Sequence, residues 1–373
     1  MAQDTACACG QGSGQDNKVE HLRPSLDQPF VSSELQTPIG PVPVVLPELT
    51  RADRLGSIKT RLGIGRMRYV VEPGLYALRN PDNHSPVLVS ANYKLSFDHL
   101  RSALPGRSAW VLVLDTKGIN VWCAAGKRTF GTQELTDRVA SSRLAEVVEH
   151  RTLIVPQLGA PGVAAHLVRR QSSFRVIFGP IKAVDLPAFL DAGNKATVAM
   201  RRKLFTVKER AVLIGVELGA VLKYGILIGL ALFFLAGLGY PGELWDNTVF
   251  HGSLALTGLI TAILAGAVAT PLLLPWLPGR AFALKGFFAG LALGALHGTF
   301  WWSANATLSG NLELGGWMLL GPAFAAFLAM NFTGSSTYTS LSGVKKEMRF
   351  AVPLEIVVGL GGLALIVTAR FVA

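Results

Sequence analysis

Residues Trp110–Asp115 read W-V-L-V-L-D, and this short run predicts the fold of the first half of the chain. Strands that are wholly apolar and rich in Val and Leu are buried on both faces, as in a parallel sheet covered by helices. The segment Thr116–Gly118 ends the strand, and the following turn brings Cys123 just past its carboxyl end. Open α/β sheets bind their ligands at that edge, so Cys123 is the leading candidate for chemistry.

Strand-like and helix-like segments alternate from Tyr69 to Asp191. The predicted strands, which begin with a short hairpin, are Tyr69–Glu72, Ala77–Arg79, Val87–Ser90, Trp110–Asp115, Thr152–Pro156 and Arg175–Phe178. The predicted helices are Phe97–Leu104, Thr132–Ser142, Gly162–Gln171 and Leu186–Asp191. This order predicts a three-layer, mostly parallel, Rossmann-like α/β domain.

The loops that follow the predicted strands are rich in small residues. Besides Cys123 they contain Asn92, Gly159 and Gly179. A wall of glycine, alanine and backbone suits a large flat ligand better than a small polar substrate, whose site needs converging charged groups. The chain has no G-x-G-x-x-G after a strand and no P-loop, so nucleotide-phosphate binding lacks its usual marks.

The position of Cys123 alone leaves a nucleophile, a metal ligand and a structural thiol open. A Cys–His hydrolase would need the fold to bring one of four histidines to the thiol, namely His84, His99, His150 or His166. The motifs H-E-x-x-H, C-x-x-C and G-x-S-x-G are absent. Near the N-terminus, Cys7 and Cys9 are either a pair of soft-metal ligands or two incidental cysteines.

The chain is too hydrophobic for an ordinary soluble protein, since half of its 373 residues are apolar, 16% are charged and the mean hydropathy is +0.40. A bilayer is crossed by about 20 apolar residues, and five stretches after residue 211 reach that length. They are approximately Leu218–Leu238, His251–Leu274, Ala281–Trp302, Leu314–Phe332 and Ala351–Ala369. We therefore predict an all-α transmembrane domain of about five helices. His251 and His297 fall in or beside these spans, where ionisable side chains are candidates for a functional role.

Lys and Arg stay preferentially on the cytoplasmic side of a membrane, and they alternate between the predicted loops. Five basic residues lie in 201–210 before the first span, whereas residues 239–250 contain none. This pattern predicts a multi-pass protein of the inner (cytoplasmic) membrane, with the α/β domain in the cytoplasm and the C-terminus outside. The net charge of +11 agrees with contact to the anionic lipid surface, and no nucleic-acid partner is predicted.

Composition divides the chain into four parts. Residues 1–47 are rich in Gly, Gln, Ser, Asp and Pro without periodicity, which is typical of a flexible tail, and they contain no apolar segment that would act as a cleaved signal. The α/β domain is predicted over 48–195, a basic linker over 196–211 and the transmembrane domain over 212–373.

The segment Asn120–Lys127 reads N-V-W-C-A-A-G-K, and it resembles the cap-helix signature of the HgcA family, the corrinoid proteins of the anaerobic mercury-methylating pair. The match is complete over these eight residues. The plan of the chain also agrees with that family, which is related to the large subunit of corrinoid iron-sulfur proteins and joins a corrinoid-binding α/β domain to a membrane domain of about five helices. The resemblance covers residues from about 50 to 373.

The resemblance implies a cobamide cofactor whose own base is displaced and whose cobalt takes the Cys123 thiolate as axial ligand, which makes Cys123 the catalytic residue. The implied cofactor contacts, together with the loop residues noted above, are Asn120, Val121, Trp122, Cys123, Ala124, Ala125, Gly126, Lys127, Asn92, Gly159 and Gly179. For Asn120 and Trp122, plain helix capping and plain packing stay equally open. The histidine-ligating motif D-x-H-x-x-G is matched only in part, because Val87 stands where glycine is required after Asp82 and His84.

The resemblance further implies a cobamide-dependent methyltransferase, which takes a methyl group from a folate-type donor or a donor methyltransferase and passes it to Hg(II), forming methylmercury. No iron-sulfur cysteine run is present, so electrons would come from a partner, which in this family is HgcB, a ferredoxin with two 4Fe-4S clusters. Two alternatives stay open. One is a membrane-anchored corrinoid methyl carrier of one-carbon metabolism without a mercury role, and the other is a transporter with a regulatory α/β domain.

Overall fold

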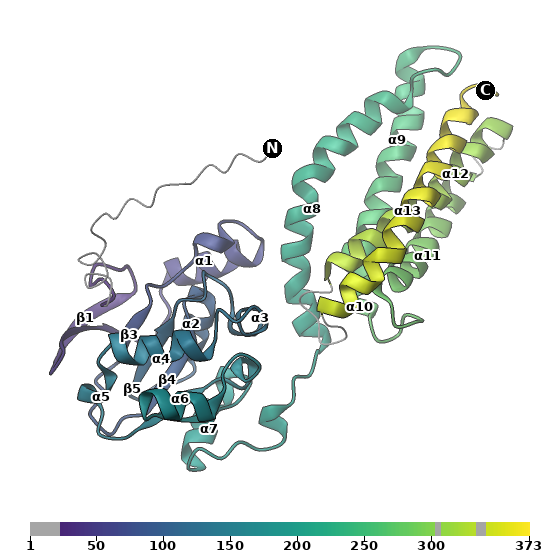
Figure 1. Ribbon diagram of the computed structural model, residues 1–373. Coiled ribbons are helices and arrows are strands. Elements are labelled where there is room, and N and C mark those ends of the chain that lie inside the picture. The colour runs from purple at the N-terminus through teal and green to yellow at the C-terminus, as the bar shows by residue number, and fades with distance from the viewer. Residues whose placement is uncertain (1–22, 303–306, 333–340) are drawn as a thin grey trace, which may run out of the picture. The chain divides into compact units, whose positions relative to one another are not determined.

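The computed structural model describes residues 23–302, 307–332 and 341–373, and these divide into two compact units (Figure 1). The first unit is an α/β domain that runs to residue 203, and the second is helical from residue 204 onward and also includes residues 59–64. The change of unit therefore falls within the stretch predicted as a basic linker. Cys7 and Cys9 lie outside the described residues.

The α/β unit is built on a mixed sheet. Its strands are β1 (Val31–Thr37), β2 (Gly40–Val45), β3 (Gly74–Leu78), β4 (Val87–Ala91), β5 (Ala109–Leu114), β6 (Thr152–Val155) and β7 (Arg175–Phe178). Their spatial order is β1-β2-β3-β5-β4-β6-β7. The pairs β1/β2 and β3/β5 are antiparallel, whereas the other four pairings are parallel. The apolar run Trp110–Asp115 is thus confirmed as a strand, since β5 is an interior strand of the sheet.

Helices cover both faces of this sheet, as predicted. They are α1 (Arg51–Arg61), α2 (Lys94–Ser102), α3 (Val121–Gly126), α4 (Thr132–Ser141), α5 (Leu144–Val147), α6 (Ala165–Ser172) and α7 (Leu186–Asp191), with short 3₁₀ turns η3 (Arg66–Arg68), η4 (Gln157–Gly159), η5 (Ala183–Asp185) and η6 (Ala199–Arg201). Alternate side chains of β5 enter two different cores. Leu112 packs in the core that contains Leu135 of α4, and Val111 packs in the core that contains Phe97 of α2.

Two local predictions are wrong. Residues 31–45 were expected in a flexible tail but form β1 and β2, because β2 pairs with β3 and buries Val44 and Val45, a tertiary contact that composition does not reveal. The expected hairpin after Tyr69 does not form. Residues 74–78 pair instead with β5, and Val70 makes a single bridge to Tyr93.

A buried ion cluster ties α2 to α1. Lys94 Nζ lies 2.8 Å from Asp53 Oδ1 and 2.6 Å from Asp98 Oδ1, and Arg101 Nη2 lies 2.8 Å from Asp53 Oδ2. All four side chains are at most 8% exposed. Burial of two acids beside two bases is tolerated because each charge has a partner.

The second unit is a helical bundle. Its elements are α8 (Val207–Ala236), α9 (Leu244–Ile263), a π-helical turn η7 (Leu264–Ala269), α10 (Thr270–Leu273), α11 (Phe282–Trp302), α12 (Leu308–Asn331) and α13 (Leu341–Ala369). The linker prediction is wrong at its end, since α8 begins at Val207 with a capping box formed by Thr206 and Glu209. The cap satisfies the free backbone N–H groups at the helix start, so the helix begins closer to the N-terminus than predicted.

Four helices of the described residues are long and apolar enough to cross a membrane by length and composition. They cover Val207–Ala236, Leu244–Leu273, Leu308–Asn331 and Gly343–Ala369. The fifth predicted span forms a helix, α11, but α11 is not among the four, and its Lys285 and His297 lower its hydropathy.

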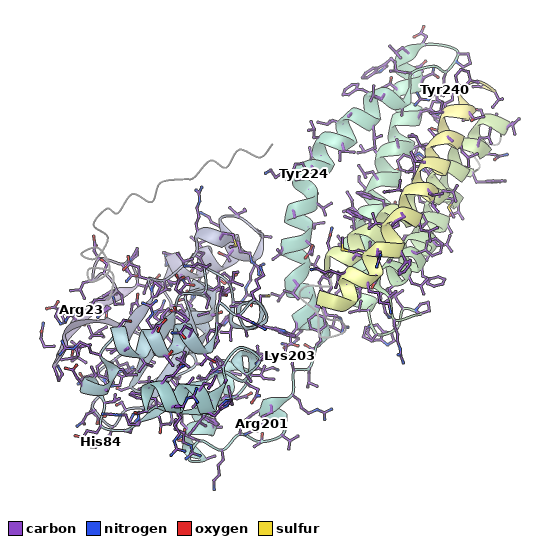
Figure 2. All side chains as sticks on the ribbon, in the orientation of Figure 1. Arg23, His84, Arg201, Lys203, Tyr224 and Tyr240 are labelled. Atoms are coloured by element: carbon purple, nitrogen blue, oxygen red, sulfur yellow. The ribbon has the colours of Figure 1, made fainter. Side chains whose placement is uncertain are left out.

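Two of these four helices expose their apolar side chains. Within the apolar stretch of α8, and also of α13, 6% of the residues are buried, against 50% in the stretches of α9–α10 and α12. Tyr224 on α8 projects outward in this way (Figure 2). Apolar surface of this extent needs a lipid or protein environment to cover it.

Candidate functional site at the carboxyl edge of the sheet

The short helix α3 carries Cys123 at the position where β5 leaves the sheet. Asn120 is its N-cap in extended conformation, and Asn120 Oδ1 accepts a hydrogen bond of 2.9 Å from the backbone N–H of Cys123. This confirms the capping prediction and shows that the amide binds the backbone of Cys123. The cap satisfies one of the free N–H groups at the helix start and holds the cysteine in the first turn.

The two sides of α3 have different surroundings. Ala124 and Ala125 are 0% and 2% exposed and belong to the hydrophobic core, against which Val121 also packs. Trp122 is 37% exposed, Cys123 is half-buried and Gly126 is exposed. These two groups follow helical spacing, so one side anchors α3 and the other faces away from the core.

This division separates the predicted cofactor contacts. In this structure Val121, Ala124 and Ala125 act as anchors of the helix, because their side chains face the core. Trp122, Cys123, Gly126 and the exposed Lys127 form the accessible side, which we call the outer face of α3.

Asn92 follows β4, and its amide organises the neighbouring loop. Asn92 Oδ1 accepts hydrogen bonds from Thr116 N at 3.1 Å and Gly118 N at 3.0 Å, and it lies 2.8 Å from Thr116 Oγ1, whose hydroxyl also lies 2.6 Å from the Ile119 carbonyl oxygen. Asn92 Nδ2 donates to Asp115 Oδ1 at 3.2 Å. The side chain is buried, and both its oxygen and its nitrogen bond to the segment that leads from β5 to α3.

Lys117 stands on the left-handed turn of this loop and pairs with Asp115. Burial raises the pKa of Asp115, but hydrogen bonds from the Lys117 side chain and backbone outweigh it and lower the pKa below its usual value. Asp115 therefore stays ionised as a fixed part of the loop.

Close backbone packing holds the segment after α3 against η4. A Cβ on Gly162 would lie 2.1 Å from the carbonyl oxygen of Phe130, and a Cβ on Gly159 would lie 2.5 Å from the Phe130 ring. Gly159, predicted as a cofactor contact, is buried here against the Phe130 ring. Gly179 is buried behind Ile154, where a Cβ would lie 3.1 Å from Cγ2.

Sequence reasoning missed the roles of Thr116, Phe130 and Gly162. Thr116 and Phe130 are both 0% exposed. A glycine in a loop gives no indication of which distant backbone it approaches, so only the fold identifies Gly162. The threonine could have been suspected from its place directly after the strand.

Two of the four candidate histidines lie at the other edge of the sheet. His84 precedes β4 and His150 precedes β6, whereas Cys123 follows β5, and these strands run parallel. The His84 side chain is 71% exposed at the periphery of the unit, 3.5 Å from Glu149 (Figure 2). A Cys–His pair with either residue is therefore excluded by topology, and the partial histidine-ligating motif lies away from the cysteine.

No group of three or more His, Cys, Asp or Glu side chains that could hold a metal ion occurs within the described ranges.

This part of the chain has known relatives. Residues 53–177 match the CdhD family model, the CO dehydrogenase/acetyl-CoA synthase delta subunit. The match begins in α1 and ends in β7, so it contains α3 and the loops around it. It covers about a third of the chain and leaves out the helical unit from residue 204 onward.

Individual relatives match over the same region. The chain is 31% identical over 123 residues to the acetyl-CoA decarbonylase/synthase complex subunit gamma of Methanopyrus kandleri, and 28% identical over 123 residues to that of Archaeoglobus fulgidus. Each match covers 32% of this chain and 26% of the relative. With the Methanocaldococcus jannaschii subunit it is 33% identical over 99 residues, or 26% of this chain and 20% of the relative. The similarity therefore spans about a quarter of the length of these relatives.

Proposed function

We propose that the α/β unit binds a cobamide with the Cys123 thiolate as axial ligand to cobalt, and that the chain carries a methyl group and transfers it to Hg(II). The observation that carries this proposal is the half-exposed cysteine on the outer face of α3, at the carboxyl edge of the sheet and within the stretch that matches the CdhD family model.

The residues present fit a large flat cofactor. A Cβ on Gly126 would meet no atom within 4 Å, so the outer face of α3 has open space next to Cys123. Trp122 adds a partly exposed indole on the same face. A corrin ring supplies four nitrogen ligands of its own, so a single protein thiolate is enough to complete axial ligation, and this agrees with the isolated position of Cys123.

Each residue of the segment has a defined task in this proposal. Asn120 fixes the first turn of α3 by accepting a hydrogen bond from the backbone N–H of Cys123. Asn92 holds the approach to α3, and Gly162 allows its close seating. When bound, the cofactor supplies a cobalt centre that accepts and releases a methyl group, and thiolate ligation makes release as a carbanion equivalent easier than imidazole ligation would.

Hg(II) as acceptor rests on the segment N-V-W-C-A-A-G-K, whose resemblance is to mercury-methylating corrinoid proteins. The proposed partners are the ferredoxin HgcB as reductant and a folate-type or protein methyl donor. The proposed location is the inner membrane, with the α/β unit in the cytoplasm and the C-terminus outside.

A second candidate function is favoured by the comparisons. The relatives are subunits of acetyl-CoA decarbonylase/synthase complexes, so a membrane-anchored methyl carrier of one-carbon metabolism would use the same cofactor and the same cysteine. The two candidates differ only in the methyl acceptor.

Cobamide ligation is tested by the visible spectrum of the purified full chain with cobalamin, in wild type and in Cys123→Ala. We expect wild type to shift the cobalamin spectrum to that of a thiolate-ligated, base-off form and Cys123→Ala to lose that signature. Identical spectra and equal affinity in both proteins would refute axial ligation by Cys123.

The acceptor is tested in cells that carry this chain and its ferredoxin. We expect methylmercury from added Hg(II) with wild type, none with Cys123→Ala, and less with Cys123→His, because imidazole donates less charge to the metal. Intact cobalamin ligation without any methylmercury would leave the one-carbon carrier as the function.

A further inference from the structure

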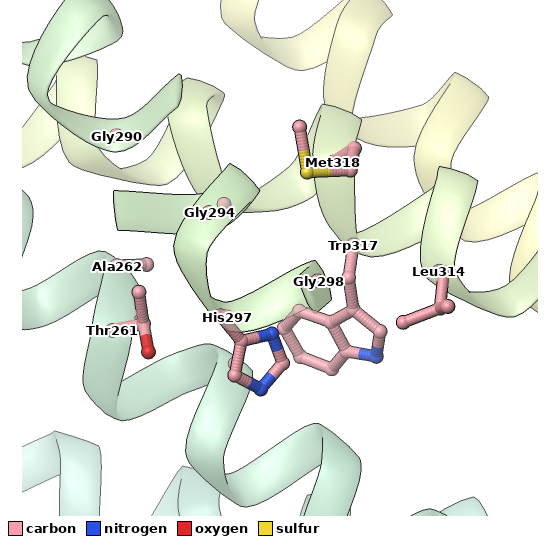
Figure 3. Close-up of a pocket in the computed structure, with 11 residues that line it drawn as sticks. Thr261, Ala262, Gly290, Gly294, His297, Gly298, Leu314, Trp317 and Met318 are labelled. Atoms are coloured by element: carbon pink, nitrogen blue, oxygen red, sulfur yellow. The ribbon is translucent and has the colours of Figure 1, made fainter. Parts of the chain in front are cut away.

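Helix α1 exposes large apolar side chains at helical spacing. Leu55 and Ile58 are 59% and 56% exposed, and Leu62, directly after the helix, is 46% exposed. We call these three residues the apolar stripe. In the helical unit, by contrast, Trp317 and Met318 line a small cavity inside the bundle (Figure 3). Exposed apolar residues that stand singly are common on proteins, but three along one side of a helix indicate a surface that another molecule covers.

The polar residues of α1 set its orientation. Asp53 belongs to the buried ion cluster, and its backbone carbonyl accepts a hydrogen bond of 3.2 Å from Tyr69 Oη. One turn later Gly56 lies against the Tyr69 ring, where a Cβ would be 2.6 Å from Cε2. Thr60 is 1% exposed. Residues 53, 56 and 60 follow helical spacing, so this side of α1 faces inward and the apolar stripe faces outward.

This orientation inverts the usual pattern of a surface helix, which buries its apolar side and exposes its polar side. The inversion is stable because the buried acid of α1 has cationic partners in the ion cluster. The apolar stripe is therefore a fixed outward feature of the folded unit.

Basic side chains flank the apolar stripe. Arg51 and Arg54 are exposed, and each precedes a stripe residue, Leu55 or Ile58, by one helical turn. Residues 51–70 contain six Lys or Arg and a single acid, Asp53, which is buried. An aliphatic stripe with cationic borders is typical of helices that lie in the headgroup region of an anionic bilayer. Protein interfaces are usually anchored by aromatic residues, and α1 has none.

The chain itself keeps α1 within reach of a bilayer. The α/β unit runs to residue 203, and α8, the first helix able to cross a membrane, begins at Val207. The intervening residues span at most about 14 Å when fully extended. Lipid headgroups are thus present at a high effective concentration around the α/β unit once α8 is inserted, so a patch of a few side chains is enough for docking.

We propose that α1 docks on the anionic lipid surface of the membrane that the helical unit spans. The guanidinium groups of Arg51 and Arg54 pair with lipid phosphates, and the apolar stripe enters the boundary between headgroups and acyl chains. Docking gives the α/β unit a fixed orientation on the bilayer. The inference rests on the proposed membrane location and uses neither the cobamide nor Hg(II).

The test uses the full chain in nanodiscs, with Cys7, Cys9 and Cys123 replaced by serine and one new cysteine labelled with bimane. Ala52→Cys places the label on α1 at an exposed position and leaves the stripe and both arginines intact. The nanodiscs contain phosphatidylcholine alone or a mixture with phosphatidylglycerol, and doxyl groups on the lipid near the headgroup quench a label at the interface. We expect roughly twofold or stronger quenching with phosphatidylglycerol and clearly less without it.

Two further label positions are the controls. Ala145→Cys is the matched one, because Ala145 is exposed on α5, which packs on the face of the sheet opposite α2, and this label should stay unquenched. Ile226→Cys lies on α8 at a position that is 62% exposed, and its label should be quenched in both lipid mixtures.

Two double variants then test the residues that dock. Leu55→Gln with Ile58→Gln should abolish the quenching at position 52 and leave the unfolding midpoint unchanged, since both side chains are more than half exposed. Arg51→Gln with Arg54→Gln should lower the quenching in the phosphatidylglycerol nanodiscs to that seen in phosphatidylcholine.

The proposal is overturned by quenching at position 52 that does not exceed that at position 145, that is equal in the two lipid mixtures, or that persists in the Leu55→Gln, Ile58→Gln protein. A blue-shifted bimane emission at position 52 that doxyl lipid leaves unquenched would also overturn it, because protein would then cover the stripe. Quenching at position 226 but not at 52, with methylmercury still produced, refutes the docking alone. An unquenched label at position 226 refutes the proposed membrane location and the docking with it.

Discussion

Replacement of Asn92 by alanine tests whether this residue braces the loop before α3 or contacts the cofactor directly. The buried Asn92 side chain makes three hydrogen bonds to the segment after β5, from the backbone N–H groups of Thr116 and Gly118 and to the Asp115 carboxylate, at 3.0–3.2 Å. Each such bond contributes about 1 kcal/mol net, so Asn92→Ala should destabilise the closed loop by about 3 kcal/mol. That free energy corresponds to roughly a hundredfold larger population of the open loop.

Hydrogen exchange of the full chain, measured by mass spectrometry without cobamide, is the direct assay. The amides of Thr116 and Gly118 should exchange roughly a hundredfold faster in Asn92→Ala than in wild type. Asn83→Ala is the matched control, because Asn83 is an exposed asparagine at the opposite edge of the sheet and should leave these amides protected.

Cobalamin affinity should fall in the same variant, since α3 loses its fixed approach. Weaker cobalamin binding with unchanged exchange at Thr116 and Gly118 would refute the bracing role and would indicate direct contact between Asn92 and the ligand.

Three further changes test the site and the unit that carries it. Asn120→Ala should lower the free energy of unfolding of the α/β unit by about 1 kcal/mol in denaturant unfolding, whereas Asn120→Ser should restore it; equal stability of all three proteins would contradict the capping role. Gly162→Ala should displace the cap segment and weaken cobalamin binding roughly 10–100-fold in a titration, and an unchanged affinity would show that the seating is not needed. Lys94→Met should destabilise the α/β unit by about 3–5 kcal/mol in denaturant unfolding, because two buried carboxylates are left with Arg101 as their one remaining cation. Burial raises the pKa of Asp53, but the hydrogen bond and charge of Lys94, with hydrogen bonds from Thr50, hold it well below its usual value, so stability should be full above about pH 4 and fall progressively below it; a pH-independent stability between pH 5 and 2 would contradict this.

Much of the α/β unit follows from local pattern. The strand before Cys123, the last strand at Arg175–Phe178 and the last helix at Leu186–Asp191 appear at or within one residue of their predicted bounds. These segments are short, strongly patterned and bounded by turn residues, so their conformation does not depend on distant partners. The strand before Gly40 was missed for the opposite reason, since its residues become a strand only by pairing with β2.

The site divides in the same way. Asn120 as N-cap and Cys123 in the first turn were predictable, because capping involves residues three apart in the chain. The bracing by Asn92, the seating at Gly162 and the opposite placement of His84 were not, because each depends on which strands are neighbours. In the helical unit the sequence predicted apolar helices, but not that Thr257 on α9 would orient His297 on α11.

The sequence by itself determined that an apolar strand delivers one cysteine to a capped turn, and that long apolar helices follow, because hydrophobic periodicity and capping act over a few residues. Only the tertiary structure decided which side of α3 is accessible, which loop holds it, and that Thr257 and His297 meet in the helical unit. The residues in these contacts lie 24 to 40 positions apart in the chain. Tertiary packing and hydrogen bonding bring them together, and local sequence pattern does not reveal them.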